Sequence, residues 1–236
     1  MGDLDTHSIY LKVMEEMGKH IAGKKETIEL LFLAVVANGH ALLEGVPGVA
    51  KTTMTKTLAS IIDADFKRIQ GTPDLEPKDI IGYTYLDENK NIVVKKGPIF
   101  TNILLLDELN RAPPKTMSAF LEALEERQVS LGGSDIPLPK PFTAFATQNP
   151  LKVEGTEPLP KVMADRFLMK IDVDYPSMEE EAQMIRIKER NEKIAVNKII
   201  GINDILEMQE QAKKVNLPDE VVKYITSVVN ETRKDI

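Results

Sequence analysis

The sequence predicts an α/β fold in which helices cover both faces of a parallel sheet, followed by a helical segment. Three observations support this fold class. Short apolar segments alternate with amphipathic ones as far as residue 175, a glycine-bearing turn ends in Lys51-Thr52, and an apolar run from 103 to 106 ends in two carboxylates. Strands that alternate with helices pair in parallel, because each helix carries the chain back to the end of the sheet at which the previous strand began.

Composition sets the broad class of the protein. The 236 residues are 42% hydrophobic and 28% charged, which is typical of a globular chain. A net charge of -7 argues against broad electrostatic binding to nucleic acid or to an anionic membrane, although a local basic groove would survive this average. The chain has no cysteine, its longest apolar span (30–37) is short of the roughly 18 residues of a membrane helix, and the N-terminus lacks signal-peptide features. We therefore expect a cytoplasmic protein with no membrane segment.

The helical and strand segments follow in order. Apolar residues recur at helical spacing between 9 and 38, broken by glycines at 18 and 23, and predict two helices before the first strand. Five strands are then predicted near 40–43, 66–69, 103–106, 142–146 and 167–171. Together they predict a five-stranded parallel sheet flanked by helices.

Two segments depart from this alternation and read as hairpins. The first spans 81–96 and the second 129–138, which turns at Gly132-Gly133, a pair suited to positive φ. Each segment is either a solvated loop or a protruding contact element, and the residues alone leave both interpretations open.

A domain boundary is predicted near residue 175. Pro176 breaks the last strand, and Ser177 with Glu180 fits a capping box that starts a helix. Amphipathic patterns then predict helices over 178–190, 204–213 and 218–233. We expect an α/β domain over 1–175 and a small helical domain that begins at 176.

The turn after the first predicted strand nearly fits the phosphate-binding pattern G-x-x-x-x-G-K-[ST], with Ala50 where the second glycine belongs. In such a loop the backbone N–H groups converge on phosphate, the lysine adds charge, and the hydroxyl reaches Mg²⁺. The candidate binding residues are Gly45, Val46, Pro47, Gly48, Val49, Ala50, Lys51, Thr52 and Thr53. The alternative is a glycine-bearing turn without a ligand.

The strand predicted at 103–106 ends in Asp107 and Glu108. A buried central strand delivers an aspartate to Mg²⁺ at its carboxyl end, and the adjacent glutamate can activate water. The pair could also be a solvated strand end. Because it follows Lys51 and Thr52 with a helix and a strand between them, the two motifs together predict an ATPase site.

Three further polar residues are ambiguous by themselves. Asn149 follows the fourth strand and could reach the γ-phosphate or the attacking water, or it could be an ordinary turn residue. Arg166 could stabilise transition-state charge or simply pair with Asp165. Arg111 could contact a neighbouring molecule or close a loop. The three histidines share no ligand spacing, so no other metal site is predicted.

These residues, taken in order, resemble the MoxR family of AAA+ ATPases. The resemblance covers nearly the whole chain. It rests on the segments Gly45–Thr52, Gln70–Leu75, Lys96–Phe100, Asp107–Thr116, Ala146–Pro150 and Ala164–Phe167. An ordered set of this kind is highly specific.

The resemblance implies an AAA+ P-loop NTPase fold with ATP and Mg²⁺ as cofactors. It implies Lys51 in the Walker A loop, Thr52 and Asp107 on the metal, Glu108 as the catalytic base and Asn149 as sensor 1. It also implies that Arg166 is an arginine finger for the adjacent subunit of a ring, expected to be hexameric.

Further implications concern the rest of the chain. The segment Ile21-Ala22-Gly23 is expected beside the adenine. The first hairpin resembles the family's helix-2 insert, and the second resembles its pre-sensor-1 hairpin. Family members continue into a longer helical lid with a sensor 2 arginine in a Ser-Pro-Arg setting, so 176–236 is expected to be a partial, truncated lid. The family consists of chaperone-type remodellers that often work with von Willebrand A domain proteins.

The leading hypothesis is therefore Mg²⁺-dependent ATP hydrolysis that drives remodelling or activation of client proteins in an oligomeric ring. The alternative is a binding module that senses ATP with little hydrolysis. A nucleic-acid motor of related architecture is disfavoured by the acidic balance and by the few lysines of the first hairpin.

Overall fold

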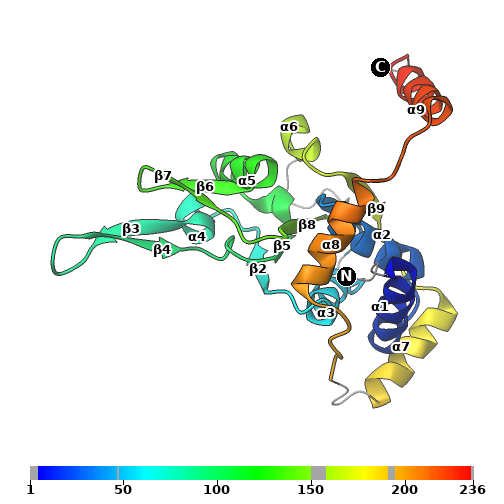
Figure 1. The fold of residues 1–236 in the computed structure, drawn as a ribbon. Helices are drawn as coiled ribbons and strands as arrows, with labels where there is room; N and C mark the ends of the chain where they lie inside the picture. Colours follow the sequence, from blue (N-terminus) through cyan, green and yellow to red (C-terminus); the bar gives the residue numbers. More distant parts are fainter. Residues whose placement is uncertain (1–4, 47, 150–157, 191–194, 235–236) are drawn as a thin grey trace.

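A computed structural model describes residues 5–46, 48–149, 158–190 and 195–234 of the chain. Its centre is a five-stranded parallel sheet with the strand order β2-β5-β8-β1-β9 (Figure 1). The strands are β1 (Ala41–Glu44), β2 (Phe66–Gln70), β5 (Ile103–Asp107), β8 (Thr143–Gln148) and β9 (Met169–Asp172). The predicted fold class is confirmed, and each strand lies within about two residues of its predicted position.

Two apolar clusters cover the two faces of the sheet. Neighbouring residues of a strand point to opposite faces, so Leu105 joins one cluster while Leu104 and Leu106 join the other. All three are essentially inaccessible to solvent. A strand buried on both faces reads as a continuous apolar run, which explains the pattern of β5.

Helices α1 and α2 precede the first strand, and further helices lie in the connections between the strands. Their bounds are α1 (Thr6–His20), α2 (Lys25–Val36), α3 (Lys51–Ile61), α4 (Pro77–Ile81), the 3₁₀ helix η1 (Leu109–Arg111), α5 (Pro114–Glu126) and α6 (Lys161–Ala164). Residues of α1, α2 and α3 belong to one apolar cluster, and residues of α5 belong to the other. In the described ranges, we find no helix with both the length and the apolar character needed to cross a membrane.

Both predicted hairpins form. The first consists of β3 (Gly82–Leu86) and β4 (Ile92–Lys96), and the second of β6 (Gln128–Leu131) and β7 (Ser134–Pro137). Gly132 and Gly133 have φ of +64° and +78°, as the turn requires. The hairpins extend from the same side of the molecule (Figure 1). Their role as contact elements stays a prediction.

The C-terminal segment forms α7 (Met178–Arg190), α8 (Ile202–Ala212) and α9 (Asp219–Thr232). The capping box before α7 is present, with Ser177 N 2.8 Å from Glu180 Oε2 and Glu180 N 3.2 Å from Ser177 Oγ. Helix α8 packs on α2, where Gln209 Nε2 donates to the Val35 carbonyl at 2.8 Å. The C-terminal segment is thus helical as predicted, but α8 returns to the core, and the domain division at residue 175 remains a proposal.

Candidate nucleotide-binding site

The loop between β1 and α3 has the backbone of a phosphate cradle. Ala50 caps the N-terminus of α3 with φ of +62°, and Gly48 has φ of +88°. The left-handed conformation costs an L-residue about 1–2 kcal/mol, which is why glycine is favoured at such a position. Ala50 therefore reproduces the backbone of the missing glycine, and the N–H groups at the start of α3 are those that such loops offer to an anion.

The first glycine of the loop is required by packing. A Cβ on Gly45 would lie 2.3 Å from the carbonyl oxygen of Val173, in the segment after β9. This close approach lets β1 end beside β9. The loop then crosses the carboxyl ends of the strands, where ligands bind in parallel α/β folds. Pro47, a predicted binding residue, lies outside the described residues.

Lys51 begins α3 and turns back over the loop. Its Nζ donates to the carbonyl oxygens of Gly45 and Val46, the latter at 3.3 Å. Burial lowers the pKa of Lys51, while the nearby Asp107 and Glu108 carboxylates oppose that shift. The ammonium group is thus held between the loop and the carboxylates.

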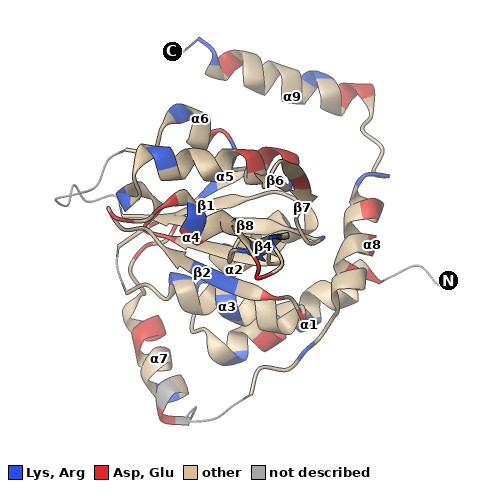
Figure 2. Ribbon diagram, turned by 90° about the vertical axis from the view of Figure 1, so that its left-hand side faces the viewer, with Lys and Arg blue, Asp and Glu red and all other residues tan. Residues whose placement is uncertain are grey.

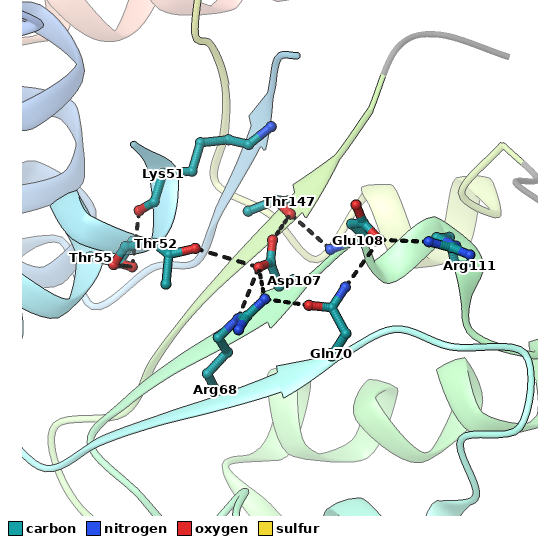
Figure 3. A network of polar contacts seen from close by, with 9 residues as sticks. All are labelled: Lys51, Thr52, Thr55, Arg68, Gln70, Asp107, Glu108, Arg111 and Thr147. Carbon is teal, nitrogen blue, oxygen red and sulfur yellow. Dashed lines mark hydrogen bonds and ion pairs between the residues drawn. The ribbon is translucent and has the colours of Figure 1, made fainter. Parts of the chain in front are cut away.

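Asp107 is the centre of a polar network at the end of β5 (Figure 3). Its Oδ1 accepts a hydrogen bond from Thr147 Oγ1 at 2.7 Å, and its Oδ2 lies 3.4 Å from Thr52 Oγ1. Arg68, on β2, donates through Nε to the same Oδ2 at 2.9 Å. The predicted pair of Thr52 and Asp107 is therefore brought together, and a basic partner joins it.

Glu108 follows directly, with φ of +52°. Its Oε2 accepts hydrogen bonds from Gln70 Nε2 and Arg111 Nη1, each at 3.0 Å (Figure 3). Its backbone N–H donates to Thr147 Oγ1 at 2.8 Å. Arg111, whose role the sequence leaves open, thus contacts the candidate base within its own chain.

The two motifs border one cavity of about 350 Å³. Its lining residues are Gly45, Gly48, Val49, Ala50, Lys51, Thr52, Thr53, Asp107, Glu108, Thr147, Gln148 and Asn149. Asn149, at the end of β8, is thereby placed with the other candidates. In the described ranges no three His, Asp or Glu side chains form a metal cluster. The Thr52 hydroxyl and the Asp107 carboxylate nevertheless fit Mg²⁺, which takes few protein oxygens and completes its shell with phosphate and water.

A second, mostly apolar cavity of about 380 Å³ adjoins the first through Val49, Ala50 and Thr53. Its other lining residues are His20, Ile21, Ala22, Lys24, Pro176, Met184 and Ile187. Gly23 does not line it. That glycine has φ of +63° and lies against Glu180, so its part is to turn the chain between α1 and α2. His20 and the residues of α7 had no local motif that could reveal them.

Arg166 lies apart from both cavities. Its Nη2 is 2.8 Å from Glu125 Oε2, on α5, and its Nη1 is 3.9 Å from Asp165 Oδ2. In Figure 2 the ribbon of α5 is red over part of its length, where its acidic residues lie. Arg166 therefore does not reach the nucleotide site of its own chain in this structure, and a role toward an adjacent subunit remains untested.

Several known proteins are similar to this chain in sequence, and a solved structure is similar to it in fold. Residues 40–169 match the family model described as ATPase family associated with various cellular activities (AAA). The uncharacterized protein YeaC of Bacillus subtilis is 42% identical over 98% of this chain and 72% of its own length. Chaperone MoxR1 of Mycobacterium tuberculosis is 44% identical over 93% of this chain, which spans only 58% of MoxR1.

A crystal structure from Cytophaga hutchinsonii, described as a "putative ATPase", has a TM-score of 0.86 and 44% identity. The matched region covers 95% of this chain and 69% of the Cytophaga hutchinsonii chain. A phosphate loop, an Asp-Glu strand end and a parallel sheet with the order β2-β5-β8-β1-β9 define an AAA-type ATPase. The chain belongs to the MoxR family of AAA ATPases.

Proposed function

We propose that the protein hydrolyses ATP with Mg²⁺ and uses the reaction to remodel or activate client proteins. The observation that carries the chemistry is the convergence of Lys51, Thr52, Asp107 and Glu108 on one cavity that continues into an apolar one. The first cavity suits a charged triphosphate, and the second suits a flat base.

Each residue has a separate task in this proposal. Lys51 and the amides at the start of α3 hold the phosphates, and Thr52 and Asp107 would hold Mg²⁺. When bound there, Mg²⁺ would supply positive charge that neutralises the triphosphate. Glu108 orients and deprotonates the attacking water, and Asn149 positions that water or the γ-phosphate.

The biological role is inferred from the family. MoxR1 is described as a chaperone, and we propose a similar task for this chain, carried out in a ring that is expected to be a hexamer. Arg166 would complete the site of the adjacent subunit. A client protein, with a von Willebrand A domain protein as partner, would receive the conformational change.

The sharpest test of the chemistry is Glu108→Gln. This variant should bind Mg·ATP with nearly unchanged affinity and lose turnover by about 100-fold or more, because the amide cannot accept a proton. Glu122→Gln, on the polar side of α5, is the matched control and should turn over normally. Unchanged turnover in Glu108→Gln would reject the assigned base.

A second candidate is a module that senses ATP and scarcely hydrolyses it. It is favoured by the engagement of Glu108 Oε2 with both Gln70 and Arg111, since these two donors occupy the oxygen that would otherwise accept a hydrogen bond from the attacking water. Micromolar binding of ATP with negligible hydrolysis by the wild-type chain would select this candidate over the first.

A further inference from the structure

Two walls of the apolar cavity come from distant parts of the chain. One is the turn between α1 and α2, and the other is Pro176 with Met184 and Ile187 of α7. No residue of α7 whose side chain the structure describes is buried, and the helix lies at the lower edge of the molecule in both views (Figures 1 and 2). Packing alone therefore holds this wall weakly, and the polar contacts at its start gain importance.

Glu180 makes the contact between the two walls. Its Oε1 accepts a hydrogen bond from the backbone N–H of Lys24 at 3.0 Å, across 156 residues of sequence. Its Oε2 lies 3.9 Å from Lys24 Nζ, and that ammonium group donates to the carbonyl oxygens of Asp174 at 2.8 Å and Tyr175 at 3.1 Å. In the described part of the chain, no other side chain of α7 hydrogen-bonds beyond the turn that starts the helix.

Gly23 leaves space for this contact. It has φ of +63°, and a Cβ built on it would lie 1.8 Å from Glu180 Oε1 and 2.2 Å from Glu180 Cδ. A side chain at residue 23 would therefore displace the carboxylate that accepts from Lys24. The glycine is required by the approach of α7 to the turn as well as by its left-handed backbone.

The same carboxylate also caps α7. Its Oε2 accepts from Ser177 N at 2.8 Å, and Glu180 N donates to Ser177 Oγ at 3.2 Å. Hydrogen bonds from the Ser177 and Lys24 backbones lower the pKa of Glu180, so the carboxylate accepts them as an ionised group. Its two oxygens thus have separate partners, Ser177 at the start of the helix and Lys24 in the turn.

We propose that Glu180 is a positioning residue that latches α7 to the turn between α1 and α2 and so slows the release of a bound nucleotide. The inference rests on the proposed nucleotide site and deepens it. The base would lie between the two walls, so its release requires α7 to separate from the turn. That separation breaks the hydrogen bond from Lys24 to Glu180, which adds to the barrier. The phosphates would lie in the other cavity, where none of the described lining residues belongs to α7.

The test measures release of ADP that carries an N-methylanthraniloyl fluorophore on the ribose, chased with excess unlabelled ADP in the presence of Mg²⁺. Glu180→Ala should release it about tenfold faster than the wild-type chain, because a hydrogen bond to a charged acceptor is lost. Glu180→Gln, whose amide oxygen can accept from Lys24, should restore part of the retention. Binding of inorganic triphosphate, measured by calorimetry, should be unchanged in Glu180→Ala, because that ligand does not reach the apolar cavity.

Ser177→Ala is the matched control, because it removes the hydroxyl half of the capping box and keeps the contact with Lys24. It should change the release rate by less than about twofold, which separates capping of α7 from the latch. Gly23→Ala, alone and combined with Glu180→Ala, completes a double-mutant cycle. It should speed release in the wild-type chain and add little once the carboxylate is gone, since its Cβ acts by displacing Glu180.

An unchanged release rate in Glu180→Ala would overturn the proposal. Equal acceleration in Ser177→Ala would overturn it too, because the effect would then belong to helix capping, and so would weaker binding of triphosphate in Glu180→Ala, because the damage would then extend beyond the apolar cavity. All three outcomes leave the ATPase proposal intact. Absence of any nucleotide binding by the wild-type chain would instead reject the proposed function, and this inference with it.

Discussion

Arg68 Nη2 lies 2.7 Å from Asp107 Oδ2. The same oxygen accepts from Arg68 Nε at 2.9 Å and lies 3.4 Å from Thr52 Oγ1. A guanidinium group is thus placed on the carboxylate oxygen nearest to the hydroxyl that would share the magnesium ion. Two cations cannot both occupy this oxygen without strong repulsion, so binding of Mg²⁺ would displace Arg68.

The first prediction concerns this competition. In Arg68→Ala, the Mg²⁺ concentration that gives half-maximal ADP binding should fall about three- to tenfold, because the ion no longer displaces a guanidinium group. The modest size reflects the half-exposed side chain of Arg68. Calorimetric titration of Mg²⁺ at a fixed ADP concentration measures the effect without relying on turnover.

Lys67→Ala is the matched control for that measurement. Lys67 lies on the same strand, one residue earlier, and its side chain therefore points to the opposite face. Removing it changes the net charge equally and should leave the Mg²⁺ dependence unchanged. A higher Mg²⁺ requirement in Arg68→Ala would mean that the arginine assists the ion or the phosphates, and would contradict the competition.

The second prediction concerns the strained alanine of the phosphate loop. Ala50→Gly should leave the protein as stable as the wild type or more stable by up to about 1 kcal/mol, because glycine adopts φ of +62° without the steric cost. ADP affinity should be retained. Thermal unfolding and calorimetry measure the two quantities.

Ala37→Gly provides the contrast. Ala37 has φ of -74° at the end of α2, where alanine is unstrained and glycine only adds freedom to the unfolded chain. This substitution should destabilise by about 0.5–1 kcal/mol. If Ala50→Gly destabilised the protein as much as Ala37→Gly does, the left-handed conformation of Ala50 would carry no cost and the argument would fail.

The fold was predictable where residue patterns are local. The run before Asp107 is apolar at every position because β5 is buried on both faces, and Gly132-Gly133 adopts the positive φ of a tight turn without steric cost. The phosphate loop and the carboxylate pair were likewise readable, since both depend on residues adjacent in sequence.

The rest depends on contacts between distant segments. Gln70 reaches Glu108 because parallel pairing places Gln70 beside Asp107, and no local pattern of β2 indicates this. The return of α8 to the core is set by contacts such as Gln209 with Val35, so amphipathic spacing predicted the helix but not its partner. Ile21, Ala22 and Gly23 were expected beside the adenine; Ile21 and Ala22 line the apolar cavity, whereas Gly23 does not.

The third prediction concerns the buried carboxylate of Glu16. Burial alone would raise the pKa of this carboxylate, but hydrogen bonds from the Asn197 backbone, Lys19, the Asn197 side chain and His20 outweigh it and lower the pKa to about 2. This pKa lies below the ordinary value of 4.5, so the ionised group stabilises the folded state above pH 4.5, and this contribution is lost as pH falls toward 2. Glu16→Gln should therefore destabilise the protein at pH 7 by about 2–3 kcal/mol and by much less near pH 3. Urea unfolding at both pH values measures the difference.

Glu15→Gln is the matched control, because Glu15 is the preceding residue of α1 and its side chain is 72% exposed. It should change stability by less than about 0.5 kcal/mol at either pH. Glu16 also accepts two hydrogen bonds from Asn197, in the segment before α8, at 2.9 and 3.1 Å. An equal loss of stability in Glu16→Gln at pH 7 and pH 3 would contradict a role for its charge.

The last prediction concerns Arg166, which contacts Glu125 and does not line the cavity of its own chain. Arg166→Ala should bind ADP as the wild type does, because no lining residue is lost, and should lose turnover by about 100-fold or more if the side chain acts on an adjacent subunit. Mixing it with Lys51→Ala should then restore part of the activity, since some junctions pair an intact phosphate loop with an intact arginine. Inactive mixtures that still assemble, or weakened ADP binding by Arg166→Ala in the monomer, would contradict action in trans. Glu125→Gln in an otherwise wild-type chain is the control for the ion pair between Arg166 and Glu125. It removes the carboxylate that Arg166 contacts within its own chain and keeps the arginine.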